Sequence, residues 1–546
     1  MKKVLMILVV GMVLAFFLGS TYAVEVFRTK TELIWYDKDK TCDGYVMHWP
    51  MKEKASKRNN YKDPLGKLYL TDMEGYVIQT WPGIANNPKL YPDGVVLNND
   101  QLSSDPKQAY WASMDWEGNK TRLFPAQTGS DSRRIWNKKL RQYTYLDKIR
   151  DSDGYSKEEI VAKGGDPALS YGNVSGESIN EYDRNGNIIW RWRFIDHVIQ
   201  DRNPAWPNYV GKGKTIEDYP GKQNLFHKTD ASAFRNRGEG IQRDWHHCNS
   251  LDYNEDLDLI AINSKNWSEF YVIDHGNTFV AGDLSASIAL AASSKGDFLY
   301  RFGNPSAYQQ GKPPGFGTEG DQQMYGAHNI QWIKPYAWER PHSEAGDTWP
   351  DPAEYKTDVA LPGAGNFLIF DNGVYNPKLA HSEVLEINPY ISGIERSTGE
   401  PIIGKVMVNP PDAGYKSNGD SNQIVWKYKS ILPNSFFSQS QAGMNRLPNG
   451  NTHIHSANTG HMFQVTPAGE VVWEYINPVS SYDDTGHMIQ TEWPAEYRGR
   501  EFDEHRSVWY SPLHPAFQGK DMTRKGTITG RPPSPLGPLP GGITEY

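Results

Sequence analysis

Three histidine-containing stretches carry the side chains best suited to catalysis near neutral pH. They are DWHHCNS (244–250), YGAHN (325–329) and NTHIHSANTGH (451–461). A neutral imidazole can attack an electrophile and hold it as a covalent adduct. Imidazoles grouped with a thiolate can instead bind copper or zinc. The residue types are therefore compatible with histidine-based group transfer and with metal-dependent catalysis.

The third stretch lies in a segment, 446–478, that predicts three consecutive strands. An Asn-Gly pair at 449–450 favours a tight turn, because both residues tolerate a positive φ. Polar and apolar residues then alternate, so His453 and His455 project from the same face of a strand. A Pro-Ala-Gly turn leads into the aromatic strand VVWEY (471–475). This pattern is typical of one blade of a β-propeller.

Weaker copies of this pattern recur along the chain, each with a turn of the form Asp/Asn-x-x-Gly, apolar residues and an aromatic residue. The copies predict homologous outer strands, and their spacing suits blades of about 40–50 residues with insertions. We expect an all-β fold, a six-bladed β-propeller with long loop insertions and room for a seventh blade among degraded copies. These outer strands lie at 71–82, 114–125, 182–194, 293–305 and 466–478, and a sixth copy, at 419–428, has a degraded turn.

Four regions follow from these patterns. Lys2 and Lys3 precede an apolar run over 4–19, which predicts a secretory signal peptide and a periplasmic or secreted protein. After its cleavage we expect no membrane span. The regions are a signal peptide (1–23), an N-terminal extension (24–64), the propeller (65–514) and an extended C-terminal tail (515–546).

Composition narrows the classes of partner. The chain has 546 residues and a formal net charge of −8, so it lacks the basic surface that nucleic-acid binding requires. No Gly-rich phosphate-binding motif is present, which excludes a recognisable nucleotide site. Cys42 and Cys248 are the only cysteines; whether they pair stays open, as does self-association into a homo-oligomer.

Several motifs together resemble the bacterial arylsulfotransferase family, the PAPS-independent aryl-sulfate sulfotransferases. The likeness covers roughly 65–480 and is carried by DWHHCNSLDYN, LYRFGNPSAYQQG, YGAHNIQWI, LPGAGNFLIFDNG and the segment 446–478. The resemblance implies a six-bladed propeller that transfers a sulfuryl group between phenols through a sulfohistidine. It also implies that His247 matches the histidine of the pattern D-W-x-H-x-N-S. His328 matches the first histidine of G-Q-H-D-A-H-W-I.

The chain departs from the family at several of these positions. Gln331 replaces the second histidine of the latter pattern, and Asn329 replaces its aspartate. The arginine that usually follows the Asp-Asn-Gly at 371–373 is missing. His453, His455 and His461 stand where many relatives carry other residues.

Our preferred hypothesis is sulfuryl transfer from a simple phenolic sulfate without a cofactor, with a small aromatic or phenolic compound as partner. His328 or His455 is the favoured nucleophile, and activity should fall below the ordinary imidazole pKa of about 6.5. The expected catalytic residues are His247, His328 and His455, around one axial cavity. The expected substrate-binding residues are Asn249, Asn329, Asn372, Arg446, His453 and His461.

Two alternatives remain open at this point. One is a copper- or zinc-dependent oxidoreductase on a propeller scaffold. Its ligands would come from His246, His247, Cys248, His453 and His455. The other is a propeller that binds a ligand without catalysis.

Overall fold

The structure of the chain is a computed structural model. The residues that it describes are 31–50, 67–82, 87–100, 110–125, 131–172, 174–234, 241, 243–343, 349–378, 381–389, 423–430, 436–482, 488–490, 504–535 and 542–545. The signal peptide predicted at 1–23 lies outside them.

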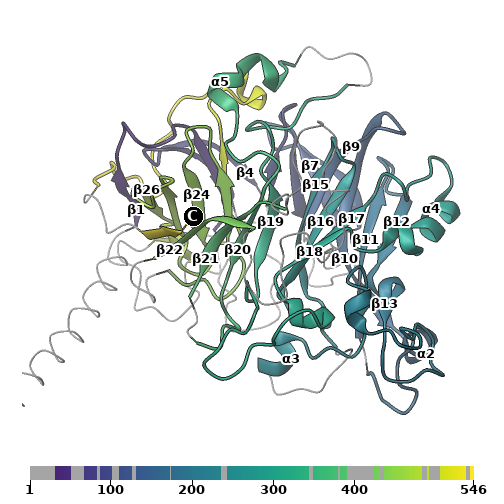
Figure 1. The fold of residues 1–546 in the computed structure, drawn as a ribbon. Coiled ribbons are helices and arrows are strands. Elements are labelled where there is room, and N and C mark those ends of the chain that lie inside the picture. Colours follow the sequence, from purple (N-terminus) through teal and green to yellow (C-terminus); the bar gives the residue numbers. More distant parts are fainter. Residues whose placement is uncertain are drawn as a thin grey trace, which may run out of the picture.

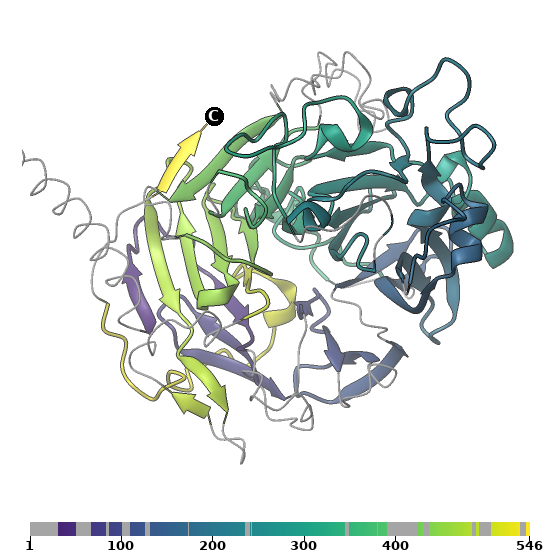
Figure 2. The same cartoon turned by 90° about the horizontal axis from the view of Figure 1, so that it is seen from below.

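Six sheets of four or five antiparallel strands surround a common axis and form a six-bladed β-propeller, as expected (Figure 2). We number the blades 1 to 6 along the chain and give their strands from the axis outward. Blade 1 comprises β29 (Val508–Tyr510), β2 (Tyr45–His48), β3 (Lys67–Asp72) and β4 (Val77–Pro82). Blade 2 comprises β5 (Lys89–Leu90), β6 (Val96–Asp100), β7 (Tyr110–Met114) and β8 (Lys120–Pro125). Blade 3 comprises β9 (Ser132–Asn137), β10 (Gln142–Tyr155), β11 (Val174–Tyr182) and β12 (Ile188–Arg193).

The second half of the ring follows the same order. Blade 4 comprises β15 (Cys248–Asn254), β16 (Leu259–Ser264), β17 (Glu269–Asp274) and β18 (Tyr300–Phe302). Blade 5 comprises β19 (His328–Trp332), β20 (Phe367–Asp371), β21 (Glu383–Ile387), β22 (Ile424–Ser430) and β30 (Gly542–Glu545). Blade 6 comprises β23 (Gly443–Arg446), β24 (Thr452–Ser456), β25 (His461–Val465), β26 (Val471–Ile476) and β1 (Glu32–Tyr36).

Segments from both ends of the chain complete the ring. Strand β29 supplies the innermost strand of blade 1, and β1 pairs with β26 at the outer edge of blade 6. The domain boundaries expected from the sequence therefore need correction. Strands β1 and β2 lie inside the predicted extension 24–64, and β30 from the predicted tail pairs with β22. An exposed sheet edge accepts any extended segment, so the edge strands β1, β29 and β30 need no turn motif of their own.

The repeated turn and its aromatic residue have defined structural roles. In blade 1 the N–H of Gly75 donates to the carbonyl of Asp72, and Gly75 has a φ of 88°. Gly118, Gly186 and Gly469 close equivalent turns with φ between 82° and 85°. Each position needs the left-handed backbone that glycine adopts readily.

The tryptophans of the outer strands bind the neighbouring blades. The indole N–H groups of Trp81, Trp426 and Trp473 donate to the carbonyl oxygens of Asp115, Pro467 and Met73, at 3.0, 2.9 and 2.6 Å. Each acceptor lies in or beside the turn before the outer strand of the next blade. The repeated aromatic residue thus joins adjacent blades as well as filling the space between them.

The remaining elements lie in the insertions (Figure 1). They are the two-stranded ladders β13 (Val198–Ile199) with β14 (Gln223–Asn224) and β27 (Val479–Tyr482) with β28 (Met488–Gln490), and the helices α2 (Lys157–Ala162), α3 (Asp230–Phe234), α4 (Leu284–Ala291) and α5 (Lys356–Val359). Among the described residues, no helix has the length and apolar character needed to cross a membrane.

The direction of the strands places functional side chains on one of two faces. Strands alternate in direction within a blade, so the start of the first strand and the end of the second lie on the same face. His247 precedes β15, His328 begins β19, and Asn372 follows β20. We call the face that carries these three residues the histidine face, and the opposite one the distal face. In Figure 1, α3 marks the histidine face and α5 the distal face.

Candidate active site

His247 lies in the connection that enters β15 and has a positive φ of 53°. Its Nδ1 lies 2.7 Å from Oδ2 of Asp244, and its side chain is 36% exposed. Arg150, from within β10, forms an ion pair with Asp244 and lies 3.3 Å from the same Nδ1. The carboxylate contact is the shorter one, so Nδ1–H donates to Asp244. The lone pair of the neutral ring is then on Nε2.

Opposing effects act on the pKa of His247. Burial lowers the pKa of His247, while the hydrogen bond and negative charge of Asp244 oppose this effect. Burial alone would raise the pKa of Asp244, but the hydrogen bond from His247 and the charges of His247 and Arg150 hold that pKa below its usual range. The pair is an ionised carboxylate that orients a neutral imidazole and would stabilise its protonated form.

His328 is buried at the start of β19, with its tautomer fixed by an amide. Its Nδ1 lies 2.6 Å from Oδ1 of Asn372. The Nδ2 of Asn372 donates to the carbonyl oxygens of Ser438 and Gln441, at 2.7 and 3.1 Å. The amide oxygen therefore faces His328 and accepts from Nδ1–H, which leaves the lone pair on Nε2. Burial lowers the pKa of His328 well below its ordinary value, and the positive charge of Lys265 adds to the effect.

The two histidines share an electrostatic environment with two further residues. His328 interacts with Lys265, His247 and His505, and Lys265 also lowers the pKa of His247. The backbone N–H of Lys265 donates to the carbonyl of His247, at 3.4 Å. Residues from blades 4 and 5 and from the segment before β29 thus meet on the histidine face.

A hydrogen-bonded chain supports this arrangement from beside the ring. The Nδ2 of Asn266 donates to the carbonyl of Asp244 at 2.5 Å, and the hydroxyl of Tyr375 donates to Oδ1 of Asn266 at 3.2 Å. Asn266 follows β16 and Tyr375 follows β20, so connections from two blades hold the backbone of Asp244. Two neutral imidazoles with free lone pairs beside a lysine suit nucleophilic transfer of an anionic group.

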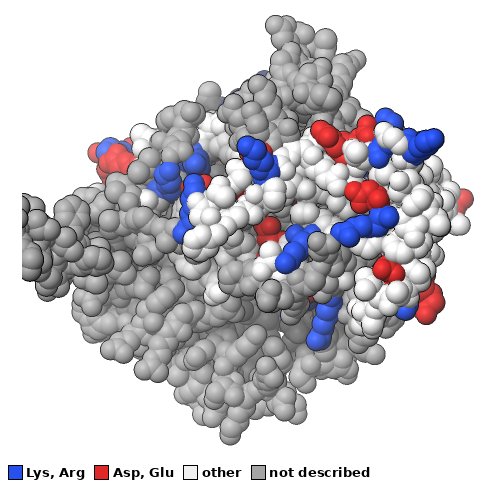
Figure 3. Space-filling model, turned by 60° about the horizontal axis from the view of Figure 1, so that its bottom comes forward, with Lys and Arg blue, Asp and Glu red and all other residues white. Residues whose placement is uncertain are grey.

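Charged side chains of both signs are interspersed over the described surface in a view from the side of the histidine face (Figure 3). That distribution does not form the single basic stripe expected of a polyanion-binding surface.

Comparison with known proteins gives one informative match. Residues 166–337 match the family model Arylsulfotransferase (ASST). This match supports a place for the chain in the arylsulfotransferase family. The matched segment runs from the end of the β10–β11 insertion to just beyond β19, and it includes His247, Lys265 and His328. The match supports a sulfotransferase-like function for this chain.

Solved structures resemble this chain only distantly. A protein of unknown function from Bacteroides caccae is 8% identical, with coverage of 86% of this chain and 99% of that chain and a TM-score of 0.37. A putative 6-phosphogluconolactonase from Bacteroides fragilis is 9% identical, with coverage of 87% and 99% and a TM-score of 0.28. Apo AztD from Citrobacter koseri is 7% identical, with coverage of 86% and 99% and a TM-score of 0.30. These likenesses carry no functional argument. No curated protein matches the chain.

His455, one of the three expected catalytic residues, has surroundings unlike those of the other two. It lies within β24 and is fully buried. Its Nδ1 accepts the backbone N–H of Ser507 at 2.8 Å, so the ring proton is on Nε2, which lies 3.4 Å from Glu504. A neutral ring in this tautomer has no free lone pair. The geometry favours a structural role for His455, in holding the segment that leads into β29.

His453 and His461, expected to bind substrate, also hold the fold of blade 6. The Nε2 of His453 lies 2.8 Å from the hydroxyl of Ser507, and His453 is fully buried. The Nε2 of His461 lies 2.6 Å from Glu474, and the ring stacks on Phe463. Alternation along the strand correctly placed His453 and His455 on one face, but the C-terminal segment covers that face.

Among the four other expected substrate-binding residues, Asn372 lies beside the reactive histidines, where it orients His328. Asn249 donates to the carbonyl of Ala327 at 2.8 Å and so ties blade 4 to blade 5. The Nδ2 of Asn329, which follows His328, lies 3.7 Å from the sulfur of Met444. Arg446 forms an ion pair with Glu386 at the far end of β23, on the distal face.

The proposed metal ligands do not assemble. His246 is fully buried, stacked on Phe194 with ring centroids 3.8 Å apart. Burial raises the pKa of the Cys248 thiol well above its ordinary value, which disfavours the thiolate that binds metals. His453 and His455 belong to blade 6, away from blade 4. Within the described part of the chain, no group of three or more His, Cys, Asp or Glu residues is arranged to hold a metal ion. Cys42 and Cys248 are both free thiols.

Sequence reasoning did not select Arg150, Lys265 or His505 as site residues. Lys265 follows the second strand of blade 4, the position that Asn372 occupies in blade 5. Aligning the ends of the second strands across blades would have identified it. Arg150 lies inside an unusually long second strand, and His505 precedes a strand with no turn motif, so neither has a comparable signal.

Proposed function

We propose that this protein transfers a sulfuryl group from a phenolic sulfate to a phenol through a sulfohistidine on His328. The observation that carries the proposal is the fixed tautomer of His328: Asn372 binds the Nδ1 proton, so Nε2 presents a lone pair beside His247 and Lys265. The family match over 166–337 supports the reaction class.

The two histidines differ in a way that separates their roles. His328 has an amide partner and a strongly lowered pKa, so it stays neutral and nucleophilic. His247 has a carboxylate partner that favours its protonated form and offsets part of the effect of burial. Two titratable groups whose surroundings push their pKa values apart are suited to different steps. His328 is the nucleophile and His247 the acid–base residue.

The reaction then takes two balanced steps. Nε2 of His328 attacks the sulfur, the bond from sulfur to the phenolic oxygen breaks, and the departing phenolate takes a proton from protonated His247. In the second step His247 accepts the proton of the incoming phenol. The phenol oxygen attacks the sulfur and the bond from sulfur to Nε2 breaks. Lys265 offsets the negative charge of the sulfuryl oxygens.

The location of the reaction is part of the proposal. The predicted signal peptide at 1–23 supports a periplasmic or secreted enzyme. Such an enzyme would meet simple sulfate esters and not depend on a nucleotide donor.

The function is tested with purified protein, 4-nitrophenyl sulfate as donor and phenol as acceptor. Release of 4-nitrophenolate should rise with phenol concentration, and His328→Ala should abolish it. His342→Ala is the matched control, since its imidazole lies on the distal face, 2.8 Å from Glu255. Donor turnover that is unchanged in His328→Ala would overturn the proposal.

A further inference from the structure

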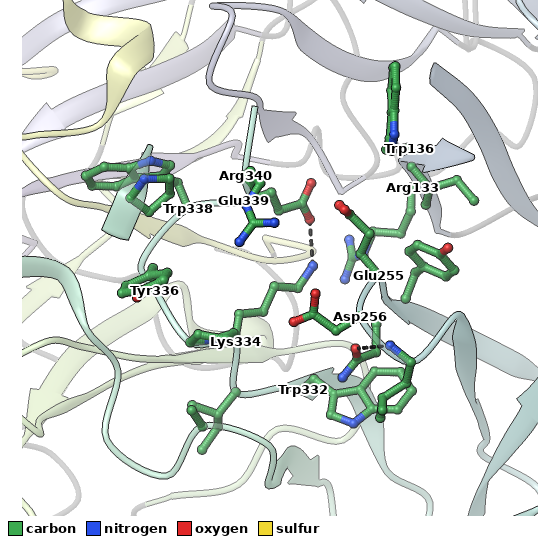
Figure 4. Close-up of a pocket in the computed structure, with 18 of the residues that line it drawn as sticks. Arg133, Trp136, Glu255, Asp256, Trp332, Lys334, Tyr336, Trp338, Glu339 and Arg340 are labelled. Atoms are coloured by element: carbon green, nitrogen blue, oxygen red, sulfur yellow. Dashed lines mark hydrogen bonds and ion pairs between the residues drawn. The ribbon is translucent and has the colours of Figure 1, made fainter. Parts of the chain in front are cut away.

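A cavity with a volume of about 550 Å³ opens on the distal face (Figure 4). Its walls come from β9, from the turn between β15 and β16, and from the long connection between β19 and β20. Trp332 ends β19 and lines this cavity, whereas His328 begins the same strand. Four residue steps along a strand cover roughly 13 Å. The cavity is therefore separate from the candidate active site.

The lining combines aromatic surface with a balanced set of charges. Five aromatic side chains contribute: Trp136, Tyr253, Trp332, Tyr336 and Trp338. Four cationic and four anionic side chains accompany them: Arg133, Arg134, Lys334 and Arg340 with Glu255, Asp256, Glu339 and Asp351. An anion would meet the four carboxylates and a cation would meet the four bases, so neither sign of charge is favoured.

Ion pairs within the wall strengthen this conclusion. Lys334 lies 2.7 Å from Glu339, as Figure 4 shows, and Arg134 lies 2.7 Å from Asp93. A charged ligand would have to compete with these existing partners. A hydroxyl group can instead donate to a carboxylate such as the exposed Asp256 and accept from a base in the same wall.

The cavity is held in shape before any ligand enters. The ring of His342 stacks on Trp136 with centroids 4.7 Å apart and an interplanar angle of 12°. The Nε2 of His342 lies 2.8 Å from Glu255, and its backbone N–H donates to the hydroxyl of Tyr143 at 2.7 Å. The β19–β20 connection is thereby fixed to blades 3 and 4. A preformed aromatic site avoids the entropic cost of ordering a loop on binding.

We infer that this distal cavity binds a neutral, polyhydroxylated ring compound, that is, a short neutral saccharide. Its apolar ring faces lie on the aromatic side chains, with Trp136 partly exposed at the wall. Its hydroxyl groups bond to the mixed acidic and basic side chains. The inference concerns a site other than the proposed sulfuryl-transfer site and does not depend on that function.

Calorimetric titration of the full chain tests this inference. The probes are the neutral trisaccharides cellotriose, maltotriose and mannotriose, with a trimer of galacturonate and a trimer of glucosamine as charged counterparts. At least one neutral trisaccharide should bind with one site per chain and more tightly than both charged trimers. Binding of none of the neutral probes, or tighter binding of a charged trimer, would overturn it.

Two substitutions then locate the binding. Trp136→Ala and Asp256→Asn should each weaken binding about tenfold or more, the first through loss of stacking and the second through loss of one of the two carboxylate acceptor oxygens and of its charge. Asp256 is exposed in a turn, so Asp256→Asn keeps the test valid should Trp136→Ala disturb the wall. Trp206→Ala, in the insertion after β13, is the matched control and should bind as the unchanged protein does. Full affinity in both cavity variants would refute the assignment.

Discussion

The partner of one ring nitrogen distinguishes the three histidines that the sequence nominated together. Asn372 accepts a proton from His328, and Asp244 accepts one from His247, so both rings keep a lone pair on Nε2. His455 instead accepts a backbone N–H and carries its proton toward Glu504. All three are histidines at or near an expected inner strand, so these sequence features do not separate them. The difference arises from groups that lie far away in sequence.

The acid limb of the pH–rate profile should lie below pH 6.5. Protonation of His328 removes its lone pair, and burial lowers the pKa of His328 well below that of a free imidazole. The neutral nucleophile therefore persists as pH falls through 6.5, contrary to the expectation from the unperturbed side chain. Initial rates of 4-nitrophenolate release, measured from pH 8 down to pH 4.5, give the midpoint. A midpoint at or above 6.5 would contradict this account of His328.

Asn372→Asp should move that limb to higher pH. A carboxylate beside Nδ1 favours the imidazolium form and raises the pKa of His328 by roughly one unit or more. The loss of rate should be largest at low pH and partly recovered at high pH, a dependence that a purely structural defect would not produce. Asn249→Asp, at an amide that binds the carbonyl of Ala327, serves as control. An unshifted profile in Asn372→Asp would show that the amide does not set the tautomer.

At the level of elements, the outer-strand tryptophans should contribute measurably to stability. Trp473→Phe keeps an aromatic ring between blades 6 and 1 but leaves the carbonyl of Met73 without its indole donor. Leaving a buried acceptor unpaired costs about 1–3 kcal/mol. Denaturant unfolding should show this loss for Trp473→Phe and for Trp426→Phe. Trp206→Phe, at a residue outside these interblade contacts, should change the midpoint little; equal losses in all three would contradict the assigned role.

The sequence predicted the outer strands because their signal is local. A glycine that must adopt a positive φ, followed by an aromatic residue, marks β4, β8, β12 and β26 within a dozen residues each, and β18 and β22 keep the aromatic residue. Strands β1, β29 and β30 have no such signature, because they pair with edges that lie hundreds of residues away. The lack of a local signal also explains why the sequence placed His453 and His455 in the candidate site. Alternation places His453 and His455 on one face of β24, but the covering segment with Glu504 and Ser507 comes from beyond the propeller repeats.

Across the whole molecule, buried neutral histidines should make folding sensitive to mild acid. Burial lowers the pKa values of His227, His453, His505 and His514 to about 3, and those of His246, His328 and His455 well below normal. The unfolded chain binds protons at these residues from about pH 6.5 downward and the folded chain does not. The free energy of unfolding is therefore fully present above pH 6.5 and is lost as pH falls toward 3. Each such histidine contributes up to about 1.4 kcal/mol per pH unit.

Urea unfolding at pH 7.5, 6.0 and 5.0 measures this effect. The unfolding midpoint should fall steadily between pH 6.0 and 5.0. His275 behaves in the opposite way, because its two carboxylate partners raise its pKa to about 10 against the effect of burial. The folded chain keeps this proton while the unfolded chain gains it near pH 6.5, so His275 adds stability as pH falls from 7.5 to 6.0 and contributes little change between pH 6.0 and 5.0. A midpoint that is independent of pH from 7.5 to 5.0 would contradict the burial of neutral imidazoles.

The central claim is that His328 carries the sulfuryl group, and mass spectrometry after incubation with donor alone tests it directly. The protein is mixed with 4-nitrophenyl sulfate without a phenol, quenched at alkaline pH to preserve the N–S bond, and digested. The account predicts one added SO₃ on the peptide that contains His328, its absence in His328→Ala, and its discharge when phenol is supplied. An adduct on the peptide of His247 or of His455, or turnover without any adduct, would contradict it.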